Sequence, residues 1–239
     1  MNAFKNILIA SFRLVQYNLK IIFANKFIYF LIAALFIFLL VTVLNILNAN
    51  AHPTEATVFW LLLVPGILLI FYPVTFGIQN DVDNRIIEIL FGIPNYRYKV
   101  WLLRLMLIFA VTLAILLILS TLSSLALTVI PIIDMVAQLM APVVFLGSAA
   151  FMVSTVVKNG SGTAVVMVIL GVVIWIARPF FANHRKWDVF LNPYDMPNTM
   201  NETVWRDIII NNRIFLVIGT ILALLYGLMN LQKREKFLQ

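Results

Sequence analysis

The sequence predicts an all-α polytopic membrane protein with six membrane-spanning helices, and three observations carry that prediction. Hydrophobic residues make up 63% of the 239 positions, charged residues make up 11%, and the mean hydropathy is +1.01. A water-soluble domain of this size needs far more charged surface. Six apolar segments are each close to the ~20 residues that a helix needs to cross a bilayer. Basic residues gather at alternate ends of these segments, as expected of a membrane protein with a fixed orientation.

The first predicted element is an amphipathic helix over residues 1–22 that lies in the plane of the membrane. Apolar residues such as Phe4, Leu8 and Phe12 fall on one side of a helical wheel, and the charged and amide residues fall on the other. This pattern is typical of an interfacial helix. A short spanning helix is disfavoured because Lys5 and Arg13 would interrupt it.

The six predicted spans follow this helix in chain order. They cover residues 27–47, 57–78, 105–130, 135–157, 162–180 and 214–231. The third apolar pattern starts near Val100 and is longer than a bilayer requires, so its first turns are expected to project from the membrane. Arg104 would then extend its side chain toward the membrane surface.

Residues 181–213 are predicted to form an outer loop, the largest extramembrane piece on that side. Within the loop, residues 201–210 are a candidate for a short helix at the membrane surface. Trp187, Tyr194 and Trp205 suit the boundary between membrane and water, where amphipathic aromatic rings gather. We expect these three residues to mark an outer gate or boundary.

The distribution of charge predicts that both termini are cytoplasmic. With the amino terminus inside, 12 of the 17 basic residues and 4 of the 10 acidic residues lie on the inner side. Because basic residues are enriched in cytoplasmic loops, the net charge of +7 is interpreted as orientation information. The basic residues flank apolar spans and form no continuous patch, so nucleic acid is not expected as a partner.

This chain lacks the residues that most enzymatic mechanisms require. There is no cysteine, which excludes disulfides, thiolate metal sites and cysteine nucleophiles. His184 and Asp188 are four positions apart, but no third ligand lies nearby, so a boundary role is favoured over a metal site. The predicted spans hold no histidine and, away from their ends, no carboxylate, which disfavours an intramembrane protease. The sequence therefore predicts a non-catalytic protein without a metal or cofactor of its own.

Small and hydroxyl residues are frequent in the spans, where they mostly allow helices to approach closely; a mildly polar passage is the alternative. They include Thr121, Ser123, Ser124, Ser148, Ala149, Ala150, Ser154 and Thr155. Asp134, at the outer end of the fourth span, is interpreted as a capping carboxylate, with a contact to transported cargo as the alternative. Pro65, Pro73 and Pro142 are either hinges or tolerated bends.

The most charged internal passage lies between the second and third spans, in the region 79–99. Four charged residues come within eight positions, namely Asp81, Asp83, Arg85 and Glu88. Apolar residues recur there at helical spacing up to Pro94, which predicts a short amphipathic helix. Such a helix is either a solvated surface element or a lever that another protein moves.

This layout resembles the membrane subunits of ABC-2 type ATP-driven exporters. In that family an interfacial helix precedes six spans, and a coupling helix with a pattern like R-E-x-G-T-L-E-x-L-L-x-x-P joins the second span to the third. Glu88 falls on the glutamate of that pattern, Ile89 and Leu90 lie in its apolar pair region, and Pro94 matches its proline. Arg104 matches the basic residue that opens the third span.

The motif also departs from the family pattern at its amino-terminal side. Asn84 and Arg85 replace the Gly-Thr pair, and Asp81 and Asp83 stand in place of the leading Arg-Glu. The carboxyl end agrees better, since an outer Asn-Pro-Tyr sequence at 192–194 leads to the last span.

The resemblance implies a permease subunit in the inner (cytoplasmic) membrane of a bacterium. It would form the translocation pathway as a dimer, with a second copy or a related chain. Two separate ATPase subunits, which bind ATP and Mg, would hold the coupling helix through an interface of Asp81, Asp83, Arg85, Glu88, Ile89, Leu90 and Pro94.

Two further interpretations stay open on the residues alone. A substrate-binding membrane subunit of an uptake complex also has six spans, but it predicts a ligand cavity closed by outer loops and has no need of the charged helix. A membrane interaction protein without transport would use that helix only as a solvated loop.

Overall fold

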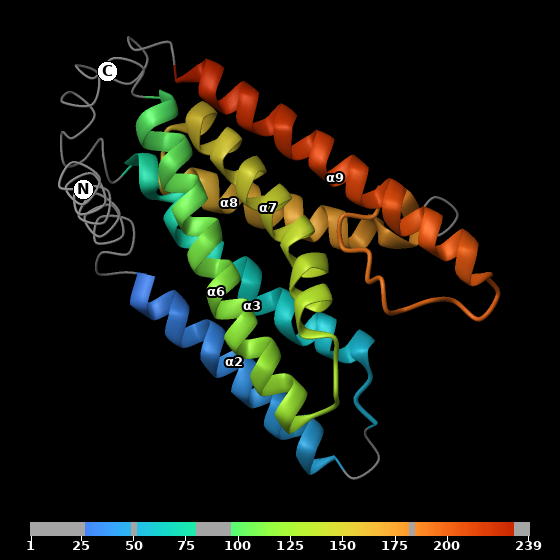
Figure 1. Ribbon diagram of the computed structural model, residues 1–239. Coiled ribbons are helices and arrows are strands. Elements are labelled where there is room, and N and C mark those ends of the chain that lie inside the picture. The colour runs from blue at the N-terminus through green and yellow to red at the C-terminus, as the bar shows by residue number, and fades with distance from the viewer. Residues whose placement is uncertain (1–26, 49–51, 80–96, 182–184, 232–239) are drawn as a thin grey trace, which may run out of the picture.

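The computed structural model describes residues 27–48, 52–79, 97–181 and 185–231 (Figure 1). Within these ranges every regular element is helical, and six helices are long and apolar enough to cross a membrane. They are α2 (Phe27–Leu47), α3 (Glu55–Thr75), α6 (Leu103–Ala126), α7 (Ile132–Val157), α8 (Gly160–Ala177) and α9 (Glu202–Asn230). Three short elements complete the described part: η1 (Arg97–Leu102), η2 (Arg178–Phe181) and η3 (Arg185–Trp187). The predicted all-helical architecture is thus confirmed for these residues, whereas the predicted interfacial helix over 1–22 lies outside them.

The sixth helix differs from its predicted extent. The apolar pattern placed the start of the last span at residue 214 and a separate short helix at 201–210, but α9 runs without a break from Glu202 to Asn230. The polar residues Asn211, Asn212 and Arg213 lowered the hydropathy there without ending the helix. The Asn211 side chain bonds to a carbonyl one turn earlier, Asn212 bonds to the loop before α9, and Arg213 bonds to α7. Because each polar side chain has a partner, the helix tolerates them.

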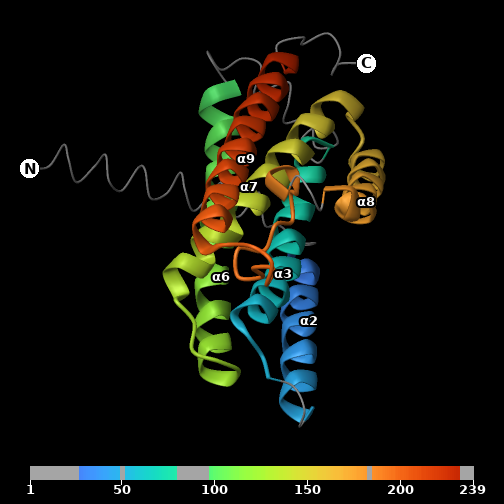
Figure 2. The same cartoon turned by 90° about the vertical axis from the view of Figure 1, so that its right-hand side faces the viewer.

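The bundle is built around α3 and α7. Helix α7 packs against α3, α6, α8 and α9, and α3 also packs against α2 and α6. Helices α8 and α9 lie on different sides of α7, and α8 stands at the edge of the bundle (Figures 1 and 2). In an apolar stretch of 18 residues, 67% of the residues are buried in α3 but only 6% in α8. Helix α3 is therefore central and α8 peripheral.

The turns between helices follow from their capping residues. Thr54 starts α3 with a capping box, in which its hydroxyl accepts from the Thr57 amide and the Thr57 hydroxyl accepts from the Thr54 amide. At the end of α7, Lys158 adopts a left-handed backbone with φ 59°, and the Asn159 side chain then caps α8 by accepting from the Gly162 amide at 3.2 Å. The chain therefore reverses between α7 and α8 within two residues.

Glycines let α7 and α9 approach closely. A Cβ atom at Gly219 would lie 2.6 Å from the Phe145 ring, and one at Gly227 would lie 2.8 Å from the Phe151 ring. Phe151 is 1% exposed, so its ring has little room to move aside. In a membrane, where lipid is as apolar as the helices, such close contact is a main source of helix association.

Arg104 differs from the expectation that its side chain reaches the membrane surface. It is 5% exposed, and its guanidinium carbon lies 4.9 Å from the centre of the Trp101 ring, one turn earlier. The face of an indole ring attracts a cation, and this attraction strengthens away from water. Arg104 therefore belongs to the interior of the bundle at the start of α6.

The close contact of α7 with α9 predicts that an added methyl group at Gly227 destabilises the protein. We expect Gly227→Ala to lose about 1–3 kcal/mol of stability, because the buried Phe151 ring has to shift. The measurement is the thermal unfolding midpoint of the purified chain in detergent.

The matched control is Gly77→Ala, since a Cβ atom at Gly77 would meet no atom within 4 Å. Its midpoint should stay at the wild-type value. Equal midpoints for the two variants would contradict the assignment of this contact.

Candidate functional site

The residues assigned by sequence to the coupling interface lie outside the described residues. They are Asp81, Asp83, Arg85, Glu88, Ile89, Leu90 and Pro94. The positions directly before and after that segment are described, at Gln79 and at the start of η1. We call the end of the bundle that carries them the Gln79 end, and the end that carries residues 185–201 the loop end.

The chain before the segment is fixed to α8. The Gln79 side-chain oxygen accepts a hydrogen bond from the Gly160 amide, at the first residue of α8. A Cβ atom at position 160 would lie 2.5 Å from the Phe76 ring, so the contact requires glycine there. The far end of α3 is therefore joined to the start of α8.

The chain after the segment enters the core at once. Residues 97–102 form a π-helical turn, a rare geometry that is frequent at functional sites, and it continues into α6. Trp101 in this turn is 4% exposed, and its ring centre lies 6.3 Å from that of Phe151 on α7. Both flanks of the segment are thus anchored in packed structure.

At the loop end, two buried asparagines hold the loop against the helices. The Asn212 side chain, on α9, donates to the carbonyls of Lys186 at 3.1 Å and Asp188 at 2.8 Å. The Asn192 side chain donates to the Ala56 carbonyl at the start of α3, at 3.0 Å. Because both side chains are at most 2% exposed, these bonds replace water for backbone groups that the loop buries.

A second set of polar contacts joins α7 to the loop and to α9. The Tyr194 hydroxyl donates to Oδ2 of Asp134 at 2.8 Å, and Nε of Arg213 donates to the Gln138 side chain at 2.8 Å. Asp134 is exposed and lies in the first turn of α7, as expected of a capping carboxylate. The structure adds to that expectation a specific partner, Tyr194.

An ion pair between described residues fixes the end of α8. Nε of Arg178 lies 3.1 Å from Oδ2 of Asp188, and the guanidinium carbon lies 4.7 Å from the Trp60 ring centre and 5.1 Å from that of Trp175. Asp188 also accepts from the Phe190 amide at 2.9 Å. His184, considered with Asp188 as a metal-ligand pair, lies outside the described residues, and Asp188 is engaged by Arg178.

The three aromatic residues proposed as an outer boundary occupy different environments. Trp187 is 45% exposed, as a boundary residue would be, and its ring packs edge-on against Phe215. Trp205 is 4% exposed, and its indole N–H donates to the Pro193 carbonyl at 2.8 Å, so it holds the loop from beneath. Tyr194 is half-buried between these extremes.

Burial and the neighbouring carboxylate both act on the phenol of Tyr194. Loss of solvent is the larger effect, and the hydrogen bond and negative charge of Asp134 add to it, so the pKa of Tyr194 lies well above its ordinary value. The phenol therefore remains a hydrogen-bond donor over the whole physiological range.

The hydroxyl residues of the spans mostly bond to their own helices. Ser123 donates to the Leu119 carbonyl, and Ser154 and Thr155 donate to carbonyls three residues earlier on α7. These three residues are buried, so among them the packing interpretation is favoured over a polar passage.

Sequence patterns did not single out Arg178, Asn212 or Arg213, and they marked Asn192 only as part of the Asn-Pro-Tyr sequence at 192–194. Each is a polar residue within or beside an apolar run, a position where burial is costly unless a partner is present. The polar triplet at 211–213, directly before an apolar run, was the available signal.

Comparison with known proteins gives no relative: no family model, no curated protein and no solved structure matches the chain.

The asparagine bonds predict that Asn212→Ala loosens the loop. The Lys186 and Asp188 carbonyls would lose the Asn212 donor, at a cost of about 1–3 kcal/mol, so amide hydrogen exchange in residues 185–195 should accelerate roughly tenfold or more. The neighbouring Asn211 is exposed and bonds only within α9, to the Asp207 carbonyl, which makes Asn211→Ala the matched control. Equal exchange in the two variants would show that Asn212 does not hold the loop.

The raised pKa of Tyr194 predicts a pH dependence of stability. A phenol whose pKa is higher when folded contributes its full stability below the unfolded value of about 10 and loses it as the pH rises further. At pH 8 we expect Tyr194→Phe to unfold at a lower temperature than the wild type, because the bond to Asp134 is gone. Above pH 10 the difference between the two midpoints should narrow. A difference that stays constant up to pH 11 would contradict the shift.

Proposed function

We propose that this chain is the permease subunit of an ABC-2 type ATP-driven exporter, with no ATPase domain of its own. In this proposal the loop end faces outward and the Gln79 end faces the cytoplasm of a bacterium. The six apolar helices, the excess of basic residues in the sequence segments predicted to face the cytoplasm and the charged sequence between α3 and α6 support it.

The observation that carries the proposal is the anchoring of both flanks of residues 80–96. Gln79 is bonded to Gly160, and Trp101 is buried against Phe151. A lever is effective only when its ends are attached to the parts that it moves. A force applied to this segment would pass directly into α3 and α6, because little slack chain lies on either side of it.

The packing of α3 supports the same function. This helix contacts α2, α6, α7 and α8, so a shift of its Gln79 end would reach most of the bundle. Pro65 and Pro73 lie inside α3, where each removes a backbone hydrogen bond and allows the helix to bend. A displacement at one end can then be converted into a change of angle at the other.

The proposal requires partners. ATP and Mg would be bound by two separate ATPase subunits, and a second membrane subunit, identical or related, would complete the pathway. Helices α2, α8 and α9 expose long rows of large apolar side chains, which supply surface for both lipid and a second subunit. The chain itself is proposed to be non-catalytic.

The absence of native cysteine allows a direct crosslinking test. Single cysteines at Asp83 and Glu88 should crosslink to the ATPase encoded beside this chain, and the yield should change at least severalfold when ATP is added. The matched control is Glu202→Cys, an exposed position in the first turn of α9 at the loop end, which should give no crosslink.

Failure of the ATPase to co-purify, together with no crosslink from either position, would overturn the exporter proposal. Crosslinks of equal yield with and without ATP would indicate a static interaction protein and would equally contradict a lever.

A further inference from the structure

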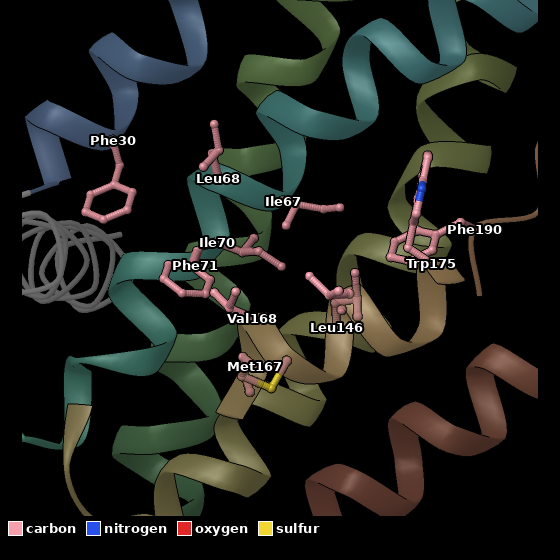
Figure 3. Close-up of a pocket in the computed structure, with 13 residues that line it drawn as sticks. Phe30, Ile67, Leu68, Ile70, Phe71, Leu146, Met167, Val168, Trp175 and Phe190 are labelled. Carbon is pink, nitrogen blue, oxygen red and sulfur yellow. The ribbon is translucent and has the colours of Figure 1, made fainter. Parts of the chain in front are cut away.

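An apolar cavity of about 380 Å³ lies between α3 and α8, with Phe30 of α2 at one end (Figure 3). Ile67 and Phe71 of α3 face Met167 and Gly171 of α8 across it. It extends along α8 as far as Trp175, which is about 12 Å from Met167 at the rise of an α-helix. The lining is aliphatic and aromatic throughout, so water gains few hydrogen bonds there.

Aromatic rings and one cation lie at the loop end of this cavity. Trp175 and Phe190 line it and pack edge-on at 5.9 Å between ring centres, and Trp60 packs edge-on against Trp175 at 5.5 Å. The Arg178 guanidinium lies over both tryptophan rings. A charged group is thus held at the point where the apolar lining ends.

A second cavity, of about 250 Å³, begins at the same arginine. Among the described residues, its charged lining consists of two cations, Arg178 and Arg185, and two anions, Asp188 and Asp195. Nε of Arg178 bonds to Asp188, and the Arg178 side chain, which is 27% exposed, lines the cavity. Asp195 is exposed. An apolar cavity, lined by Trp175, and a polar one, lined by Arg178, therefore lie on the two sides of the Arg178–Trp175 contact.

We propose that the two cavities together bind one phospholipid with a zwitterionic headgroup, from the leaflet at the loop end. One acyl chain occupies the apolar cavity, the phosphate lies at Arg178 and Arg185, and the ammonium lies at Asp195. Guanidinium groups bind phosphate through paired hydrogen bonds, and a neighbouring carboxylate suits a cation. An anionic headgroup without an ammonium would leave Asp195 unmatched, so the charge pattern favours the zwitterion.

The position of the cavity agrees with a lipid as its occupant. It opens at the side of the bundle next to α8, whose outward side chains are large and apolar, where acyl chains are the abundant apolar solute. The change from apolar to charged lining follows the change from chain to headgroup in a phospholipid. This inference does not rest on transport, because a resident lipid would fill the gap between α3 and α8 in any function.

The test adds phosphatidylethanolamine to the delipidated full chain in detergent and counts bound lipids by native mass spectrometry. We expect saturable binding of one lipid per chain. Gly171→Leu should reduce that binding tenfold or more, since a Cβ atom at Gly171 meets nothing within 4 Å and the added side chain enters the cavity. The matched control is Val173→Leu, which adds bulk at an exposed position of the same helix outside the lining and should bind as the wild type does.

A separate comparison of two phospholipids tests the headgroup assignment. Phosphatidylglycerol, which has the phosphate without the ammonium, should bind the wild type about tenfold more weakly than phosphatidylethanolamine, and Asp195→Asn should abolish that difference. Equal binding of the two lipids by the wild type would overturn the assignment.

Two other outcomes would overturn the proposal as a whole. One is retention of the lipid by Gly171→Leu with an unchanged thermal midpoint, which would place the lipid elsewhere on a folded protein. The other is a disulfide between two copies of Gly171→Cys in membranes, which would show that a second chain covers this face. The coupling crosslinks from Asp83 and Glu88 are unaffected by either result, so this failure is distinguishable from failure of the exporter proposal.

Discussion

The close packing of α7 against α3, α6 and α9 is the interaction on which the rest of the bundle depends. Lipid tails are as apolar as the leucine and isoleucine side chains of these helices, so burial of apolar surface gives little preference for one arrangement over another. Shape then decides which helices associate. Gly219 and Gly227 accept the rings of Phe145 and Phe151, and a Cβ atom at Gly147 of α7 would lie 2.6 Å from Phe109 of α6. Such fits between a ring and a bare backbone place α7 in one position between its neighbours.

Polar contacts at the two ends of the bundle fix the positions of the helices along the membrane normal. At the loop end, Asn192 and Asn212 bond to backbone carbonyls of segments that are distant in sequence. At the Gln79 end, Gln79 bonds to Gly160 across 81 positions of the chain. Moving a helix along its axis would separate these donors from their acceptors in a poorly hydrated setting. Sliding is therefore opposed at both ends, whereas bending at the prolines of α3 is not.

Hydropathy and length were sufficient to locate the helices, because six runs of apolar residues match the thickness of a bilayer. The span predicted over 27–47 coincides with α2, and the other spans overlap their helices. The start of α9 was not predictable from hydropathy, because Asn212 and Arg213 read as loop residues when their partners on α7 and in the loop are unknown.

The environments of single side chains were less predictable still. Trp205 reads as a boundary residue by its type, yet its burial depends on Pro193, twelve positions away. Arg104 reads as a surface cation, yet it stacks on Trp101. In both cases tertiary packing buries the side chain, and local pattern does not encode that burial. For the coupling residues the sequence remains the source of the assignment, since they lie outside the described part of the chain.

The two ends of α8 are attached in different ways, and this makes the helix a hinged arm. At its first residue a two-residue turn, with Lys158 in the left-handed conformation, ties it covalently to α7, and Gln79 ties it to α3. At the other end the chain continues into η2, and among the described residues the Arg178–Asp188 ion pair and ring contacts hold the helix to the bundle. Any large displacement of α8 is consequently a rotation about Gly160. The displacement of α8 would be smallest near Gly160, where α3 and α8 are bonded, and greatest at Trp175. The space between these two helices would therefore widen toward the loop end.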